Sequence, residues 1–274
     1  QLVELQDQRA GFERQGLNVA AVSYDTPEIM RDFATRKNIT YPLLSDPDSQ
    51  MIRDFGILNE SMKKGTPFYG VPHPGTYIVN PRGIVTKKFF ENDYRERYSS
   101  GTILWQTSPQ AVREGWQEAE TNHLKLRWRA SDPKARGGNR TALRVEVTLK
   151  PKMHVYAPGV QSGYIPVQWT LPANEVGKST EPVWPQAKIQ NLKAIREKAP
   201  VYEKQFTVER DVTFAQQKPL EAIAKDGKVN IESSFKYQAC DHKVCYPPVT
   251  IPLKWEFAFE PHDSTRVPAD LRRK

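Results

Sequence analysis

Cys240 and Cys245 are the only two cysteines in the chain of 274 residues, and they lie in the segment "YQACDHKVCYPPVTIPL". Two cysteines this close together can form a structural disulfide, supply part of a metal site, or exchange electrons with other thiols. Closing a loop with so few intervening residues removes little denatured-state entropy, about 2 kcal/mol against about 5 kcal/mol for a loop of 100 residues. The spacing weakens the structural interpretation and leaves it open.

The metal interpretation rests on Cys240, His242 and Cys245, which are three plausible zinc ligands. Structural zinc normally takes a fourth ligand, usually from a second paired cluster. The chain has no further cysteine, and its other histidines stand singly. We therefore predict no metal site and no cofactor.

The redox interpretation gains from the residues around the pair. The "YPP" that follows Cys245 is typical of a turn, where another thiolate could reach a sulfur. His242 would favour a thiolate on a neighbouring sulfur, whereas Asp241 would oppose it. The balance of these two effects is not readable from the sequence.

The elements that must position this pair follow two different sequence patterns, one in each half of the chain. Residues 1–104 alternate between helical and strand patterns, which predicts an α/β fold whose parallel strands are covered by helices. Thr26 and Pro27 mark one helix start, and Gly16 marks a helix end. The helices are expected at 2–16, 26–39, 48–57 and 91–100, and the strands at 17–25, 41–46 and within 75–90.

From about residue 122 the pattern becomes polar-apolar alternation between loops rich in Gly, Pro, Asn and Asp, which predicts an all-β sandwich. The expected strands lie at 123–131, 141–150, 165–172, 203–214, 228–240 and 249–259. The resulting domain prediction is an α/β domain at 1–104, a linker at 105–121, a sandwich at 122–262 and a tail at 263–274.

Composition excludes several classes of protein. Hydrophobic residues make up 38% and charged residues 26%, and the mean hydropathy is -0.67, which favours a globular chain with no transmembrane segment. The net charge of +8 is spread singly along the chain. The densest basic group, "KARGGNR" at 134–140, has no aromatic residue to stack on a base, so we predict no nucleic-acid partner.

The first domain resembles the thioredoxin-fold redoxins of the peroxiredoxin (AhpC/TSA) type. The similarity is carried by "QLVELQ", "VAAVSYDTPEIMRDFATRKNI", "YPLLSDPDSQMIRDFGI" and "VPHPGTYIVNPRGIV". It implies that Pro74 is the cis-proline that faces the active cysteine in this fold. It also implies a reactive cysteine at the start of the first long helix, which is where this chain begins. We therefore expect an active-site segment upstream of Gln1.

The second domain resembles the periplasmic N-terminal domain of the thiol:disulfide interchange protein DsbD, an immunoglobulin-like domain that passes electrons through one cysteine pair. The similarity is strongest in "YQACDHKVCYPPVTIPL", although the family commonly has one more residue between its cysteines. "PVYEKQFTVERDV" is similar to the cap loop and the strand after it. The resemblance implies that Val201, Tyr202 and Glu203 form a movable cap. The shielding phenylalanine of the family falls on Val201 here, so Tyr202 would be the shield.

The same resemblance implies that "KPKMHVYAPG" is a strand bordering the cysteines, which would place His154 and Tyr156 near them. Cys245 would be the cysteine that links to partners, with Cys240 resolving. Without the resemblance, Tyr156 and Tyr202 are ordinary core or surface aromatics and His154 is an ordinary packed or solvated histidine.

Together these features predict a bacterial, periplasmic or otherwise exported thiol-disulfide oxidoreductase that combines a thioredoxin-like α/β fold with an immunoglobulin-like sandwich. Its expected partners are thioredoxin-like or DsbD-type thiol proteins and its own upstream redoxin cysteine. Peroxide or a protein disulfide would be the final electron acceptor. The alternative is a non-catalytic scaffold or binding protein with a redox-dead thioredoxin fold and a structural disulfide.

Overall fold

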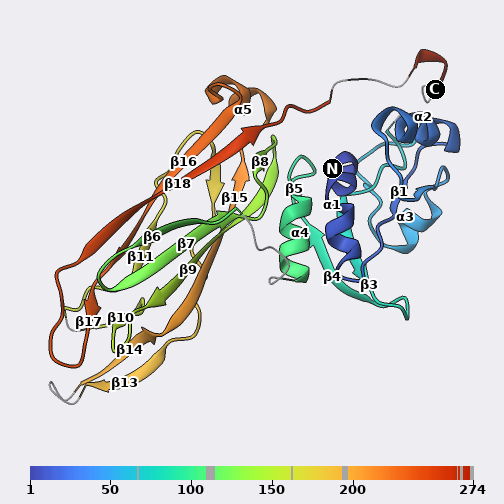
Figure 1. The fold of residues 1–274 in the computed structure, drawn as a ribbon. Coiled ribbons are helices and arrows are strands. Elements are labelled where there is room, and N and C mark those ends of the chain that lie inside the picture. Colours follow the sequence, from blue (N-terminus) through green and yellow to red (C-terminus); the bar gives the residue numbers. More distant parts are fainter. Residues whose placement is uncertain are drawn as a thin grey trace. The chain divides into compact units, whose positions relative to one another are not determined.

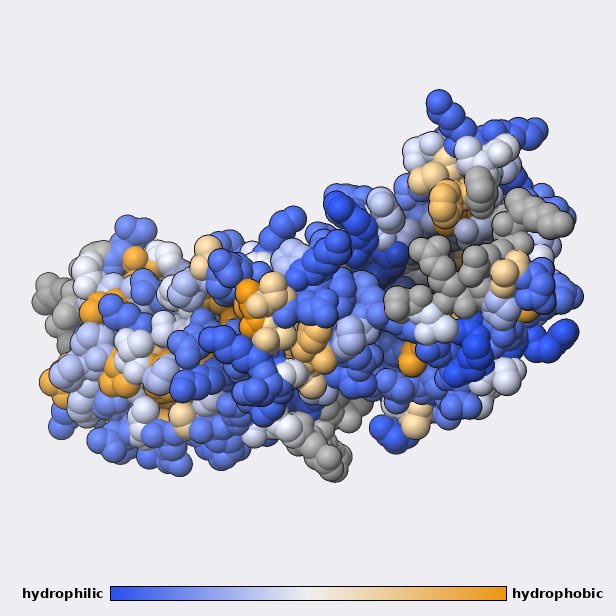
Figure 2. Space-filling model, turned by 90° about the horizontal axis from the view of Figure 1, so that it is seen from above, coloured by the Kyte–Doolittle hydropathy of each residue, from blue (hydrophilic) through white to orange (hydrophobic). Residues whose placement is uncertain are grey.

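A computed structural model of the chain contains two compact units, Gln1–Val112 with His262–Lys274, and Arg113–Pro261 (Figure 1). The structure describes residues 1–66, 68–108, 115–161, 163–192, 197–263, 265 and 268–271. Each unit encloses a hydrophobic core of its own. Figure 2 shows a largely hydrophilic surface with small, scattered hydrophobic areas, as expected of a globular chain.

The first unit has the expected alternation of helices and strands. Its elements are α1 (Leu2–Glu13), β1 (Ala21–Ser23), α2 (Pro27–Lys37), β2 (Leu43–Ser45), α3 (Gln50–Asp54), β3 (Gly75–Val79), β4 (Val85–Phe90), β5 (Arg97–Tyr98), α4 (Ser100–Thr107) and η1 (Ala269–Leu271). Thr26 is the N-cap of α2 and Pro27 its first residue, as predicted. Gly16 has φ +73°, so its left-handed conformation after α1 also matches the prediction.

The helix expected at 91–100 is wrong. The Asp93 carboxylate accepts a hydrogen bond from the backbone N–H of Arg95 at 2.9 Å, which turns the chain there. The helix starts later, because the Ser99 hydroxyl accepts a hydrogen bond from Thr102 N at 3.1 Å and caps α4. The apolar residues Ile103 and Leu104 then bury that helix against α1.

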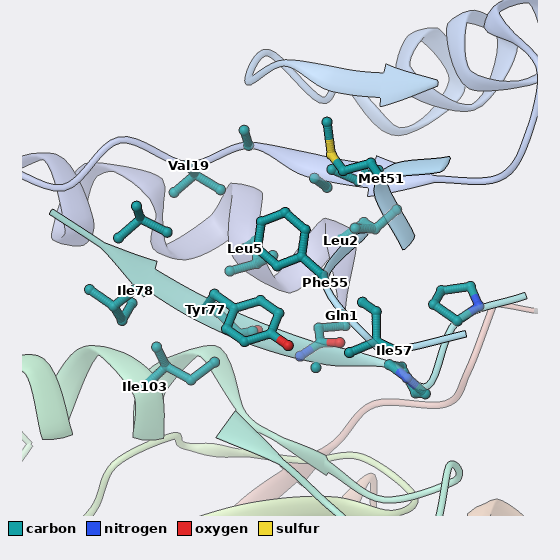
Figure 3. Close-up of a pocket in the computed structure, with 18 of the residues that line it drawn as sticks. Gln1, Leu2, Leu5, Val19, Met51, Phe55, Ile57, Tyr77, Ile78 and Ile103 are labelled. Carbon is teal, nitrogen blue, oxygen red and sulfur yellow. The ribbon is translucent and has the colours of Figure 1, made fainter. Parts of the chain in front are cut away.

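The strands of the first unit form two separate pairs. β1 pairs with β2 in parallel, and β3 pairs with β4 antiparallel, so the expected single sheet is not present among the described residues. An apolar cavity of about 460 Å³ lies between β1 and β3. Leu5 of α1, Ile103 of α4 and the rings of Phe55 and Tyr77, 5.2 Å apart, line it (Figure 3).

The second unit is β-rich, as predicted. Its elements are β6 (Gln117–Glu120), β7 (Leu124–Ala130), β8 (Lys134–Ala135), β9 (Asn139–Leu149), β10 (His154–Tyr156), β11 (Gln168–Thr170), β12 (Gly177–Ser179), β13 (Lys188–Leu192), β14 (Glu197–Glu203), β15 (Gln205–Phe214), α5 (Gln217–Ile223), β16 (Lys228–Tyr237), β17 (Ala239–Cys240) and β18 (Val249–Phe259). Sheet orders are β12-β15-β9-β7-β6, β11-β16-β18-β8 and β13-β14-β10-β17.

Strict alternation builds the sandwich core. In β16 and β18 every second residue is buried, and these residues pack with the apolar side chains of β7, β9 and β15 in one cluster. Because a strand shows opposite faces at successive residues, the sequence pattern alone specifies which side chains enter this core.

The two ends of the sandwich differ from the segments expected there. The predicted linker at 105–121 begins inside α4 and ends in β6, which is hydrogen-bonded to β7. The predicted tail contributes Asp263, whose carboxylate forms an ion pair with Lys37 at 2.5 Å. Hydrogen bonds from Lys37 and Thr265 lower the pKa of Asp263.

The side chain of Ser233 is the centre of a buried hydrogen-bond network in the sandwich. Its hydroxyl accepts hydrogen bonds from the indole N–H groups of Trp169, at 3.2 Å, and Trp255, at 2.9 Å. We expect Ser233→Ala to lower the free energy of unfolding by about 2 to 4 kcal/mol, because two buried donors lose their acceptor. Urea denaturation measures this. The matched control is Ser234→Ala, on the opposite face of the strand, and an equal loss in both variants would contradict the explanation.

Candidate functional site

The short strand β10 organises the site, because it is hydrogen-bonded along both edges. On one edge His154, Val155 and Tyr156 pair with Glu203, Tyr202 and Val201 of β14. On the other edge His154 pairs with Cys240, and Val155 pairs with Ala239 of β17. Three segments far apart in the sequence are thereby aligned around one cysteine.

The pairing register determines which side chains share a face. Directly paired residues of neighbouring strands point to the same side, so His154, Tyr156, Val201 and Cys240 share one face. Tyr156, Val201 and Cys240 form a small buried cluster with Ala199. The opposite face carries Val155, Tyr202 and Ala239, which belong to the main sandwich core.

The two cysteines form a disulfide, with their Cα atoms 4.0 Å apart. Their exposure to solvent differs sharply: Cys240 is 1% exposed and therefore buried, whereas Cys245 is exposed. The hydroxyl of Tyr156 lies 3.7 Å from Sγ of Cys245. An incoming thiolate would therefore meet Cys245 first, while Cys240 is held inside the sheet.

The loop between the cysteines is a tight hairpin closed by Asp241. One carboxylate oxygen of Asp241 accepts hydrogen bonds from Lys243 N at 2.7 Å and Val244 N at 2.8 Å. The other accepts a bond from the Tyr246 hydroxyl at 3.1 Å. The backbone hydrogen bonds lower the pKa of the Asp241 carboxyl most. Asp241 therefore shapes the turn, a role that an Asp at the first position of a turn often has.

A stacked aromatic pair lies beside the disulfide. Tyr164 stacks on Tyr156 with ring centroids 4.3 Å apart, and it packs with Val160 against the cluster that contains Cys240. Neither Tyr164 nor the structural role of Asp241 was predicted from the sequence. The aspartate could have been found from its position in "CDHKVC", but nothing local identifies Tyr164, because its contact depends on the path of a long loop.

The movable cap expected at Val201, Tyr202 and Glu203 is wrong in its form. All three residues belong to strand β14 and are hydrogen-bonded into the sheet. Tyr202 faces the sandwich core, where its hydroxyl donates to Pro185 O at 2.8 Å, so it does not shield the disulfide. Val201 does pack beside Cys240. Val201 and Tyr202 are neighbours in β14, and successive residues of a strand point to opposite faces. Val201 therefore lies on the disulfide face and Tyr202 on the core face.

His154 lies on the disulfide face beside Cys240 in the register, and it is 5% exposed. Burial lowers its pKa from the ordinary value of 6.5, with the charges of Glu203 and Asp241 opposing that change. His154 also lines a cavity that is bordered by Glu203 and by the exposed His242 of the hairpin. His154 and Tyr156 thus lie on the face of β10 that carries Cys240, and His242 lies in the hairpin between the two cysteines.

The proposed cis-proline is wrong, because no cis peptide bond occurs in the described part of the chain, which includes Pro74. Pro72 bridges to Leu58, and His73 N donates to Ile57 O at 2.6 Å. These contacts hold an extended run into β3, a conformation that the preferred trans isomer allows.

The described residues contain no group of three or more His, Cys, Asp or Glu side chains placed to hold a metal ion. Among them, too, no helix is both long and apolar enough to cross a bilayer.

The exposure difference predicts unequal thiol reactivity. After reduction, we expect a short pulse of iodoacetamide to alkylate Cys245 at least about tenfold faster than Cys240, because only the exposed thiolate is accessible. Mass spectrometry of the two single-cysteine variants, Cys240→Ala and Cys245→Ala, measures each rate alone. Equal rates in these variants would contradict the assignment.

The buried histidine predicts a pH dependence of stability. In the unfolded chain His154 regains a pKa of about 6.5, so just below that pH the unfolded state binds more protons than the folded state. The free energy of unfolding should therefore fall as the pH drops through about 6.5. We expect His154→Gln to lose less stability between pH 7.5 and 5.5 than the parent. His73→Gln, which changes an exposed histidine, is the control and should behave as the parent.

Comparison with known proteins shows relatives for each unit. Residues 1–88 match the AhpC/TSA family. A Haemophilus influenzae protein assigned as the peroxiredoxin bcp is 31% identical over 85 residues, 31% of this chain and 54% of that protein. Alkyl hydroperoxide reductase C of Staphylococcus aureus is 30% identical over 89 residues, 31% of this chain and 43% of its own length. The chain thus spans about half the length of these relatives.

Solved structures show only a distant likeness. The N-terminal periplasmic domain of ScsB from Proteus mirabilis aligns with 53% of this chain and 50% of its own, with 15% identity and a TM-score of 0.35.

Residues 110–253 match the family described as thiol:disulfide interchange protein DsbD, N-terminal. This match includes both cysteines and covers just over half of the chain, and the chain therefore belongs to the DsbD N-terminal family, with an AhpC/TSA-type region preceding that domain.

Proposed function

We propose that the protein is a thiol-disulfide oxidoreductase that carries electrons on the Cys240–Cys245 pair. The observation that carries the proposal is the disulfide with one exposed and one buried cysteine, whose exposed Sγ lies 3.7 Å from the hydroxyl of Tyr156. A purely structural disulfide needs neither this asymmetry nor a loop this short. Membership in the DsbD N-terminal family supports the same function.

The exchange begins when a partner thiolate attacks Sγ of Cys245. A mixed disulfide forms, the Cys240–Cys245 bond breaks, and the electron pair leaves on Sγ of Cys240, which then takes a proton. A second partner thiolate attacks the partner's sulfur in the mixed disulfide and releases Cys245 as a thiolate. The Tyr156 hydroxyl, 3.7 Å from Cys245 Sγ, can donate a hydrogen bond to that thiolate. The pair ends reduced and the partner oxidised.

The partners in this proposal are thioredoxin-like or DsbD-type thiol proteins. A redoxin cysteine supplied with the AhpC/TSA-type region would be a further exchange partner, with peroxide or a protein disulfide as final acceptor. We place the protein in the bacterial periplasm or another exported location, because disulfides persist in oxidising compartments and the DsbD N-terminal family supports export.

Trapping of a mixed disulfide tests the direction of attack. Cys240→Ala should accumulate a stable mixed disulfide through Cys245 with a thioredoxin-like partner that keeps one cysteine, activated as its mixed disulfide with thionitrobenzoate. The Cys245 thiolate attacks the partner's sulfur and releases thionitrobenzoate, and no Cys240 thiol remains to resolve the product. The matched Cys245→Ala variant should accumulate little, since Cys240 is buried. Non-reducing gels with mass spectrometry measure both. Trapping through Cys240 alone, or through neither cysteine, would count against the mechanism.

The reduction potential of the pair separates exchange from a structural role. A value near the thioredoxin range of about -270 mV or above supports exchange, and a value below about -300 mV supports the scaffold alternative. Equilibration of the full chain with glutathione or dithiothreitol buffers gives the potential.

A further inference from the structure

A cavity of about 490 Å³ adjoins the redox hairpin and has no assigned role. It is built by the turn that joins β9 to β10, by Glu203, Lys204 and Gln205 at the junction of β14 and β15, by Gln190 of β13, and by His242 of the hairpin. This volume lies within the range of small-molecule sites. His154, which pairs with Cys240 in the sheet, therefore borders a space of ligand size.

Two buried polar atoms in the cavity wall have no partner. Nε2 of His154 and Oε1 of Gln190 are both buried, and neither has a hydrogen-bond partner among the described residues. A buried polar atom without a partner costs about 1 to 3 kcal/mol. A ligand that offers both a donor and an acceptor, as a peptide amide does, would satisfy the two atoms together.

The charge at the rim favours an anion. Lys150, Lys152 and Lys204 line the cavity, against the single carboxylate of Glu203. Lys150 is paired with Glu120 at 3.0 Å, whereas Lys152 and Lys204 have no ion-pair partner in the part of the chain that the structure describes. Because the ammonium groups of Lys152 and Lys204 have no such partner there, both can pair with a carboxylate of a ligand.

We propose that this cavity binds a short anionic peptide thiol, with its amide at His154 and Gln190 and its carboxylates at Lys152 and Lys204. The inference rests on the proposed function, because it names the substrate class of the same disulfide. The bound thiolate attacks Sγ of Cys245, a mixed disulfide forms, and the Cys240–Cys245 bond breaks. The electron pair goes to Sγ of Cys240, which takes a proton from solvent. The thiol comes either from a free tripeptide or from an acidic segment around a partner's cysteine.

Calorimetric titration of the oxidised full chain tests the proposal with unreactive probes. One arm uses S-methylglutathione, and the other uses an S-methylcysteine peptide flanked by Asp and Glu. We expect saturable binding in at least one arm, which also identifies the source. His154→Phe and Gln190→Leu should each weaken binding about tenfold, because each removes one polar contact. His73→Phe and Gln168→Leu, outside the cavity, are the matched controls.

A surface variant guards against misfolding of the buried substitutions. Lys152→Gln combined with Lys204→Gln should weaken binding and reduce its salt dependence, whereas Lys178→Gln combined with Lys225→Gln should not. The proposal is overturned if neither probe binds, or if all cavity variants bind as the controls do. Because the probes cannot exchange, failure of both probes to bind the parent chain, with intact trapping of mixed disulfides at Cys245, overturns this inference and leaves the proposed function standing.

Discussion

The geometry around the disulfide depends on the two-sided hydrogen bonding of β10. This strand has only the residues His154–Tyr156, yet it joins β14 to β17 and so fixes what lies on each side of Cys240. Its pleat sends Val155 into the sandwich core and presents His154 and Tyr156 to the disulfide. The site is rigid for this reason: moving Cys240 would mean breaking a sheet whose other face is core.

Local pattern was sufficient to predict much of the fold. The strands of the sandwich follow from polar-apolar alternation, and α2 follows from Thr26 and Pro27. The position of the cysteine hairpin follows from "ACDHKVCYPP". Each of these features depends on neighbouring residues only, where capping and strand periodicity dominate.

The errors arose where the outcome depends on distant contacts. Tyr202 was expected to shield the disulfide, but its register with Val155 turns it into the core. The stacking of Tyr164 on Tyr156 and the cavity position of Gln190 depend on loops and strands that meet only in the folded chain. Among the described residues of the first unit, β1 pairs with β2 and β3 with β4, and a cavity lies between β1 and β3 in place of hydrogen bonds.

The carboxylate of Asp241 has a consequence for the reduced protein. Its hydrogen bonds to Lys243 N and Val244 N do not involve sulfur, so they can persist when the disulfide opens. The backbone bond from Tyr246 N to Ala239 O, at 2.9 Å, closes the same hairpin. The two thiols therefore stay close together at a high effective concentration, because these hydrogen bonds keep the loop between them closed. When an oxidised partner's disulfide has been attacked by Cys245, displacement of the partner thiol by Cys240 is then an intramolecular step that requires no search by the chain.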